Sequence, residues 1–259
     1  MNRRTFLALS AVGASQLLGT ATAQPDDDVG VSTTNWPEVD ASTLGGWSEY
    51  TRGTYPLSAT FISQLDFGLE GEINTLVYEN SELRQQISHD TAGRLDTVMM
   101  AFFTSKITLN NKYIGQLVPL GKVTAQIRKS FHRNVSEAGI SEIEFTGTTK
   151  QDDNRIRTLF TAVNTPVSSS SSSRGRQETS EPSGPSVPVE GFIDTWKVGG
   201  DVFIAGGAYP AVEQLVVDRP DSLSFGDGEY NIPINRVVTV LFKPEQYRET
   251  LEQMVVSVE

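Results

Sequence analysis

The chain of 259 residues contains no cysteine and only two histidines, His89 and His132. Without cysteine there can be no disulfide framework, no thiolate nucleophile, and no thiolate site for zinc or an iron–sulfur cluster. Two histidines are also too few for a metal cage built from imidazoles. We therefore predict that the protein has no metal site and no cofactor.

Basic residues are also scarce, because 21 Lys and Arg stand against 32 Asp and Glu, for a net charge of −11. Such a surface repels phosphate backbones and anionic membranes, so we predict no nucleic-acid partner. Arginine outnumbers lysine by 14 to 7. At molar salt the Debye length falls to about 3 Å, which screens self-repulsion while hydrated carboxylates keep the surface soluble. The composition fits either a protein of a salty environment or an ordinary acidic secreted protein.

The first 23 residues have the features of a secretory signal. Arg3 and Arg4 precede a short and mildly apolar stretch, and Ala21 and Ala23 form the small-residue cleavage site. The arginine pair and the weak hydrophobicity favour a twin-arginine signal, which exports folded proteins, over a general secretory signal with an incidental arginine pair. Combined with the acidic composition, this signal favours a haloarchaeal source.

Past residue 23, no stretch approaches the ~20 apolar residues of a membrane helix. Cleavage after Ala23 removes Arg3 and Arg4 and takes the net charge from −11 to −13. No cysteine follows the cleavage site, so we expect no lipid anchor. The sequence thus predicts a secreted or extracellular protein without a transmembrane segment.

Two segments of the mature chain have the composition of flexible regions. Residues 24–45 are acidic and rich in small residues, and they predict a flexible leader. In residues 165–188, Ser, Gly and Pro fill 15 of 24 positions, including six consecutive serines. This segment is either an interdomain linker or a disordered loop between two strands. We prefer the loop, because the strand-like segment after it needs partners from the first half. The result is a single domain over residues 46–259.

Several runs alternate apolar and polar residues with period two, as half-buried strands do. The run 95–107 is apolar on both faces and predicts a central strand. The remaining strands are expected to form hairpins, because turn residues such as Gly199-Gly200 separate them. The predicted hairpins pair residues 57–67 with 71–79, 142–149 with 155–163, and 190–197 with 202–209.

Two segments have helical periodicity. In residues 122–138, an apolar stripe repeats every fourth position, and Gly139 is a natural helix stop. A second helix is predicted from Pro244, which suits a first helical position. Sequential hairpins with two amphipathic helices predict an α+β fold in which helices cover an antiparallel sheet. The residues of the first stripe are Val123, Ile127, Phe131 and Val135.

Four segments within residues 45–215 carry a family resemblance: Gly45-Gly46-Trp47, residues 74–79, residues 98–103 and residues 201–210. With these segments the chain resembles a haloarchaeal family of exported proteins and lipoproteins of unknown function. That resemblance implies export, although the lipobox cysteine of most members is missing. The order of elements is also similar to PsbP-like α/β/α sandwiches, which implies an accessory or binding module by fold analogy. Neither resemblance supplies catalytic residues.

Two local motifs suggest chemistry at first sight. Ser88-His89-Asp90 holds the three residue types of a hydrolytic triad, but consecutive side chains diverge, so we expect a polar loop. A basic cluster on the solvent side of the helix at 122–138 is a candidate anion-binding site, with charge-assisted bonds to a carboxylate or phosphate. The alternative for this cluster is an ordinary solvated helix face. Its residues are Arg128, Lys129, His132 and Arg133.

The sequence leaves open whether the protein is an enzyme. The leading hypothesis is an exported, non-enzymatic module that binds a surface protein or a small ligand, because no catalytic set assembles from the motifs. The alternative is a secreted hydrolase that uses two carboxylates, which 32 acidic residues cannot reveal without geometry. A pocket holding two facing acids, or a histidine beside a serine, would favour the hydrolase.

Overall fold

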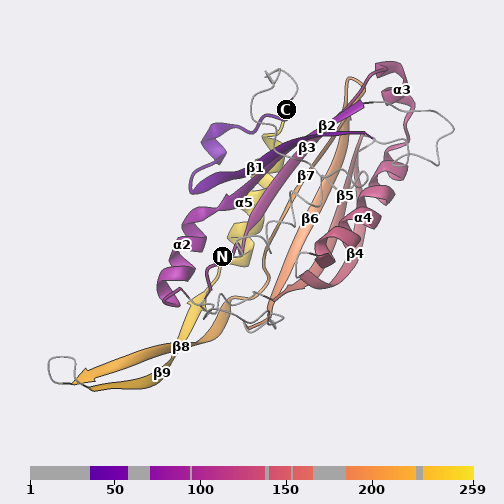
Figure 1. The fold of residues 1–259 in the computed structure, drawn as a ribbon. Helices are drawn as coiled ribbons and strands as arrows, with labels where there is room; N and C mark the ends of the chain where they lie inside the picture. Colours follow the sequence, from indigo (N-terminus) through magenta and orange to yellow (C-terminus); the bar gives the residue numbers. More distant parts are fainter. Residues whose placement is uncertain are drawn as a thin grey trace, which may run out of the picture.

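The computed structural model describes residues 36–57, 71–93, 95–137, 140–152, 154–165, 185–225 and 230–259. A seven-stranded sheet with strand order β1-β2-β3-β7-β6-β5-β4 forms the body, and every neighbouring pair is antiparallel (Figure 1). Its strands are β1 (Trp47–Pro56), β2 (Gly71–Asn80), β3 (Ala101–Leu109), β4 (Ile140–Asp152), β5 (Arg155–Asn164), β6 (Val187–Val198) and β7 (Asp201–Pro210).

The sheet consists of two meanders that meet at its centre. Strands β1, β2 and β3 form the first meander, and β4 to β7 form the second, with β7 pairing β3. The chain passes between the meanders through α3 (Lys112–Leu117) and α4 (Leu120–Glu137). Antiparallel strands with a few helices make this an α+β fold, as the sequence predicted.

Two of the three predicted hairpin turns are present where the sequence placed them. Gly199 and Gly200 have φ values of +59° and +100°, and they join β6 to β7 as a two-residue hairpin turn. Two consecutive positive φ values suit the right-handed twist of the strands and favour glycine. At the β4–β5 turn the Asp152 carboxylate accepts a hydrogen bond from the Asn154 backbone N–H at 2.7 Å. Both hairpins are confirmed, with strands a few residues longer than predicted.

Helix α4 packs on one face of the sheet. Its residues Val123, Ile127 and Phe131 share one apolar cluster with Phe160 of β5 and Ile193 of β6. The predicted helix at 122–138 and its buried stripe are confirmed over these three positions. Side-chain surroundings of Val135 lie outside the described residues.

The C-terminal helix α5 (Pro244–Val256) packs on the other face, along β7. Leu251, Met254 and Val255 are fully buried there, in a cluster with Phe102 and Phe203. Helix α2 (Ser81–Asp90) contributes two buried side chains to this second cluster. The sheet thus has an apolar cluster on each face.

The residues before β1 also belong to the folded body. In residues 36–45, assigned to the leader from composition, Ala41–Thr43 form a short 3-10 helix, η3. Val39 forms a β-bridge with Val258, and the Glu38 and Glu259 backbones exchange two hydrogen bonds of 3.1 Å. Two main-chain bonds therefore tie this segment to the last residues of the chain.

Strand assignments differ from the sequence prediction in the first half. The partner of β2 is β1, which ends at Pro56, and not the run 57–67. Residues 58–70 lie outside the described residues. The central strand β3 starts at Ala101 rather than at residue 95. Apolar alternation predicted these segments, but it does not fix where a strand begins.

Residues 165–186 connect β5 to β6, which pair directly from Asn164 and Val187 onward. The connection therefore joins neighbouring strands of one sheet. Its serine run lies outside the described residues, and β6 begins within the segment that composition assigned to the loop.

Past β7 the chain forms a separate two-stranded sheet, β8 (Gln214–Phe225) and β9 (Tyr230–Leu241). This β8–β9 ribbon extends away from the seven-stranded body (Figure 1). Leu215, Val217 and Val240 anchor its base in the apolar cluster of α5. Residues 226–229, between β8 and β9, lie outside the described residues. Among the described residues, no helix combines the length and the apolar character needed to cross a membrane.

Candidate functional site

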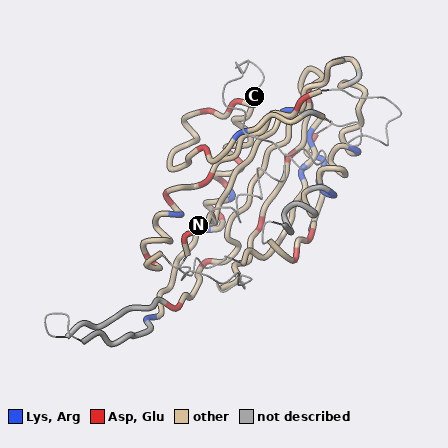
Figure 2. Tube along the Cα trace, in the orientation of Figure 1, with Lys and Arg blue, Asp and Glu red and all other residues tan. Residues whose placement is uncertain are grey.

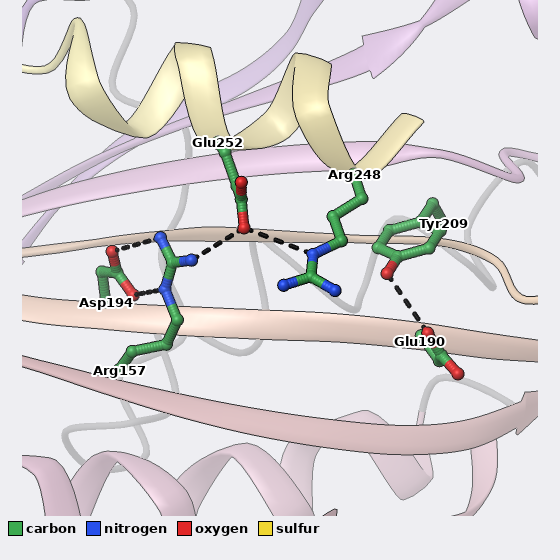
Figure 3. Close-up of polar contacts among 6 residues, drawn as sticks. All are labelled: Arg157, Glu190, Asp194, Tyr209, Arg248 and Glu252. Atoms are coloured by element: carbon green, nitrogen blue, oxygen red, sulfur yellow. Dashed lines mark hydrogen bonds and ion pairs between the residues drawn. The ribbon is translucent and has the colours of Figure 1, made fainter. Parts of the chain in front are cut away.

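A charged network around Arg157 links strands β5 and β6 to helix α5 (Figure 3). Arg157 of β5 lies opposite Asp194 of β6. The Arg157 guanidinium donates from Nε and Nη2 to the two Asp194 carboxylate oxygens, at 2.8 and 3.0 Å. Its Nη1 donates to Glu252 of α5 at 2.8 Å. One guanidinium thus binds two carboxylates from different elements.

Burial makes this network a strong constraint. The Asp194 side chain is fully buried and that of Arg157 is 17% exposed. The guanidinium also lies over the Phe192 ring, 4.5 Å from its centroid. The hydrogen bonds to Asp194, opposed by burial, raise the pKa of Arg157 above its ordinary value. Removing one partner of a buried ion pair leaves an uncompensated buried charge, which is strongly destabilising.

Further contacts lie toward the start of β6 and the end of β7 (Figure 3). Arg248 donates from Nε to Glu252 at 3.3 Å. Nearby, the Tyr209 hydroxyl donates to Glu190 at 3.2 Å. Burial, together with the Glu190 charge, raises the pKa of Tyr209 to about 12. Tyr209 therefore remains a neutral hydrogen-bond donor at physiological pH.

Asp194 and Glu252 are one pair of acidic side chains that the structure brings together. Both carboxylates are bonded to Arg157, whose Nε, Nη1 and Nη2 are all occupied. One guanidinium thus joins β5, β6 and α5, and the arrangement suits holding α5 on the sheet.

A row of cations and aromatic rings crosses the same face near the opposite strand ends. Arg155, Trp196, Phe203 and Lys106 occupy directly paired positions on β5, β6, β7 and β3. The two rings stack with centroids 5.5 Å apart, and a cation lies over each outer ring face. Stacked rings flanked by cations are mutually attractive. Trp196 is buried.

Ser88, His89 and Asp90 lie in the last turn of α2, so the expected polar loop is wrong. Asn80 caps this helix by accepting from the Leu83 backbone N–H at 2.9 Å, a signal that the sequence analysis missed. The His89 side chain is 89% exposed, and its Nδ1 lies 3.3 Å from a carboxylate oxygen of its neighbour Asp90. Consecutive positions on a helix diverge, so these three side chains do not form a triad.

Of the four residues in the predicted anion site on α4, the structure describes the side chains of three. Arg128 lies over the Phe145 ring of β4, 4.6 Å from its centroid, so its charge is directed to the sheet edge. Lys129 and His132 are exposed. Side-chain surroundings of Arg133 lie outside the described residues. The anion site at these four residues therefore stays a prediction.

Exposed apolar side chains gather at two ends of the molecule. In the part of the chain that the structure describes, eight large apolar side chains are exposed. Six of them form two sets with exposed fractions from 56% to 81%. The tip patch consists of Tyr113 and Leu117 on α3 and Val198 at the β6–β7 turn; the ribbon patch consists of Val216, Val237 and Leu241.

Each patch has a local structural origin. At the tip, Lys197 of β6 donates from Nζ to the Gln116 carbonyl of α3 at 3.2 Å, which places α3 beside the β6–β7 turn. In the ribbon, Asp218 pairs Val237, and Thr239 pairs Val216. Directly paired residues share a face of a sheet, and this face is opposite to the one anchored in the core.

Within the described residues, no group of three or more His, Asp or Glu side chains is close enough to bind a metal ion. The described residues thus form an α+β sheet protein with a buried charged network around Arg157 and two exposed apolar patches. The chain belongs to the family described as a domain of unknown function (DUF6517), whose model matches residues 36–259. Comparisons with curated proteins and with solved structures find no match.

Proposed function

We propose that this protein is an exported, non-enzymatic binding or accessory module that acts by contact with another protein at or outside the cell surface. The clustering of six exposed apolar side chains into the tip patch and the ribbon patch carries this proposal. Soluble proteins rarely expose grouped apolar side chains, and such groups mark interaction sites. A surface protein is favoured over a small ligand, because both patches project outward on α3 and on the ribbon.

The proposal also includes the export route of the protein and the salty environment in which it acts. Arg3, Arg4, Ala21 and Ala23 support twin-arginine export, and the acidic composition supports a haloarchaeal source. We also propose that the fold is a PsbP-like α/β/α sandwich, because that fold implies an accessory or binding role by analogy. In brine, screening of the surplus negative charge leaves apolar contact as the main attractive force between proteins.

The contact role is tested with a photo-reactive amino acid placed in turn at Val216, Leu117 and Val256, in cells that produce the full chain. Val256 is a matched control, because it is 73% exposed and belongs to neither patch. We expect protein crosslinks from Val216 and Leu117 in the extracellular fraction, and none from Val256. Equal crosslinking at all three positions, or none at any of them, would contradict the contact role.

The export claim has an independent readout. Mass spectrometry of the extracellular chain is expected to find an N-terminus at Gln24, immediately after Ala23. Substitution of both Arg3 and Arg4 by Lys is expected to stop export. An intact Met1 on material confined to the cytoplasm would contradict this part of the proposal.

A further inference from the structure

The β8–β9 ribbon has a free edge on each of its two strands. Figure 1 shows the ribbon extending away from the body, and within the described residues no third strand pairs with β8 or β9. A free edge presents a row of unpaired N–H and C=O groups to which another strand can add. Val216 and Val237 are exposed on these strands, and valine favours strand structure. The ribbon thus has the features of a site for strand addition.

Irregular pairing interrupts the two edges of the main sheet but not those of the ribbon. Strand β4 changes register at three places in its pairing with β5, and β1 changes register once in its pairing with β2. Such irregularities bend an edge and disrupt its row of backbone groups. Strands β8 and β9, in contrast, keep one register from the pair Gln214–Leu241 to the pair Phe225–Tyr230. Bulges therefore do not protect the ribbon.

Local repulsion between like charges does not protect the ribbon either. Asp218 and Arg236 are both exposed in the half of the ribbon nearest the body. Figure 2 shows acidic and basic segments where the ribbon leaves the body. A surface that carries both signs can place opposite charges together when it meets a copy of itself, so charge does not keep two ribbons apart.

Each strand of the ribbon contains one proline, Pro220 in β8 and Pro233 in β9. Opposed residues of an antiparallel pair alternate between pairs that exchange backbone hydrogen bonds and pairs that do not. The Phe242 N–H donates to the Glu213 carbonyl at 2.7 Å, so this opposed pair is of the bonded kind. Along the unbroken register, the pairs that contain Pro220 and Pro233 are both of the non-bonded kind. Their nitrogens therefore point away from the partner strand, toward the free edges.

We propose that Pro220 and Pro233 block the addition of further strands to the ribbon, Pro220 at the β8 edge and Pro233 at the β9 edge. A strand that added to either edge would meet a proline ring where it needs an N–H. The pairing of β8 with β9 loses no hydrogen bond, because neither nitrogen faces it. This inference goes beyond the proposed contact role and does not depend on it, since it concerns the edges of the ribbon and not its exposed face.

Replacement of the prolines tests the proposal at each edge separately. Pro220→Thr restores an N–H on the β8 edge, Pro233→Thr restores one on the β9 edge, and the double variant opens both edges. A copy with one open edge can pair only with the same edge of a second copy, so each single variant is expected to form dimers and no larger species. The double variant is expected to form open-ended assemblies that bind thioflavin T.

The matched control carries Ser222→Thr and Asn235→Thr. These residues stand opposite the two prolines, so the control adds β-branched side chains to the same pairs without adding an N–H. Light scattering coupled to size exclusion measures the size of each protein, and circular dichroism checks its fold. The control is expected to match the natural sequence. In the Pro220→Thr dimer, the Val216 and Ser222 amides are expected to exchange hydrogen more slowly than in the natural sequence.

Three outcomes would overturn the protection of the edges by proline. The double variant could stay as dispersed as the natural sequence, the control could assemble to the same extent as the double variant, or the single variants could grow without limit. Crosslinks from Val216 of the natural sequence to another protein are measured independently of these variants. Failure of the contact role and failure of the edge protection are therefore distinguishable.

Discussion

Arg157 and Asp194 face each other across β5 and β6 and share two N–H···O bonds of 2.8 and 3.0 Å. Asp194→Ala removes the fully buried partner of Arg157 and leaves its guanidinium, which is 17% exposed, with Glu252 alone. We expect the free energy of unfolding to fall by about 3–5 kcal/mol. Unfolding in urea, which is uncharged, is the suitable measurement.

Glu252→Gln is the matched comparison. Glu252 contacts the same guanidinium, but its side chain is 33% exposed. Water compensates for a lost contact of this kind, so the expected cost is about 1 kcal/mol or less. Equal losses for the two variants would show that burial of the Arg157–Asp194 pair is unimportant for stability.

Alkaline pH is expected to destabilise the protein through Tyr209. Its pKa rises from 10.0 to about 12 because of burial and the Glu190 charge. The stability due to neutral Tyr209 is complete below pH 10 and is lost as the pH rises through about 12. Tyrosinate absorbance during a pH titration reports the ionisation, and urea unfolding at each pH reports the stability. In Tyr209→Phe, the free energy of unfolding is expected to fall less between pH 10 and 12 than in the natural sequence. The same pH dependence in both proteins would show that Tyr209 does not cause the loss.

Glycine at position 207 is expected to be required by the contact between α5 and the sheet. A Cβ at Gly207 would lie 2.5 Å from the Ala101 carbonyl oxygen and 2.7 Å from Leu251 Cδ2. Gly207→Ala is therefore expected to lower the unfolding free energy by about 1–3 kcal/mol. Gly121→Ala in α4 is the control, since nothing lies within 4 Å there, and it is expected to stabilise by up to about 1 kcal/mol. Thermal unfolding separates these opposite signs.

Local signals in the sequence predicted the second half of the main sheet well. Gly199-Gly200 requires positive φ, and Asp152 closes its own turn, so both hairpins follow from chemistry within a few residues. The helix start at Pro244 is equally local, because proline fits the first helical turn. The first half was harder, since the partner of β2 is set by long-range packing rather than by alternation.

The candidate site could not be predicted from spacing. Arg157, Asp194 and Glu252 are 37 and 58 residues apart along the chain, and only strand register and the path of α5 bring them together. The helix α2 was missed because its sequence is mostly polar, although Asn80 is a standard capping residue. Exposure of Tyr113 and Leu117 is also invisible to composition, because apolar residues predict burial by default.

The bonds between Glu38 and Glu259 hold the two ends of the folded domain side by side. Strands β5 and β6 pair on either side of the connection at 165–186, so that connection also begins and ends at one place. A chain whose original ends are fused by a short linker, and which opens within the connection instead, would retain every strand pairing of the sheet. The order of the elements along the polypeptide is therefore separable from the architecture that they build.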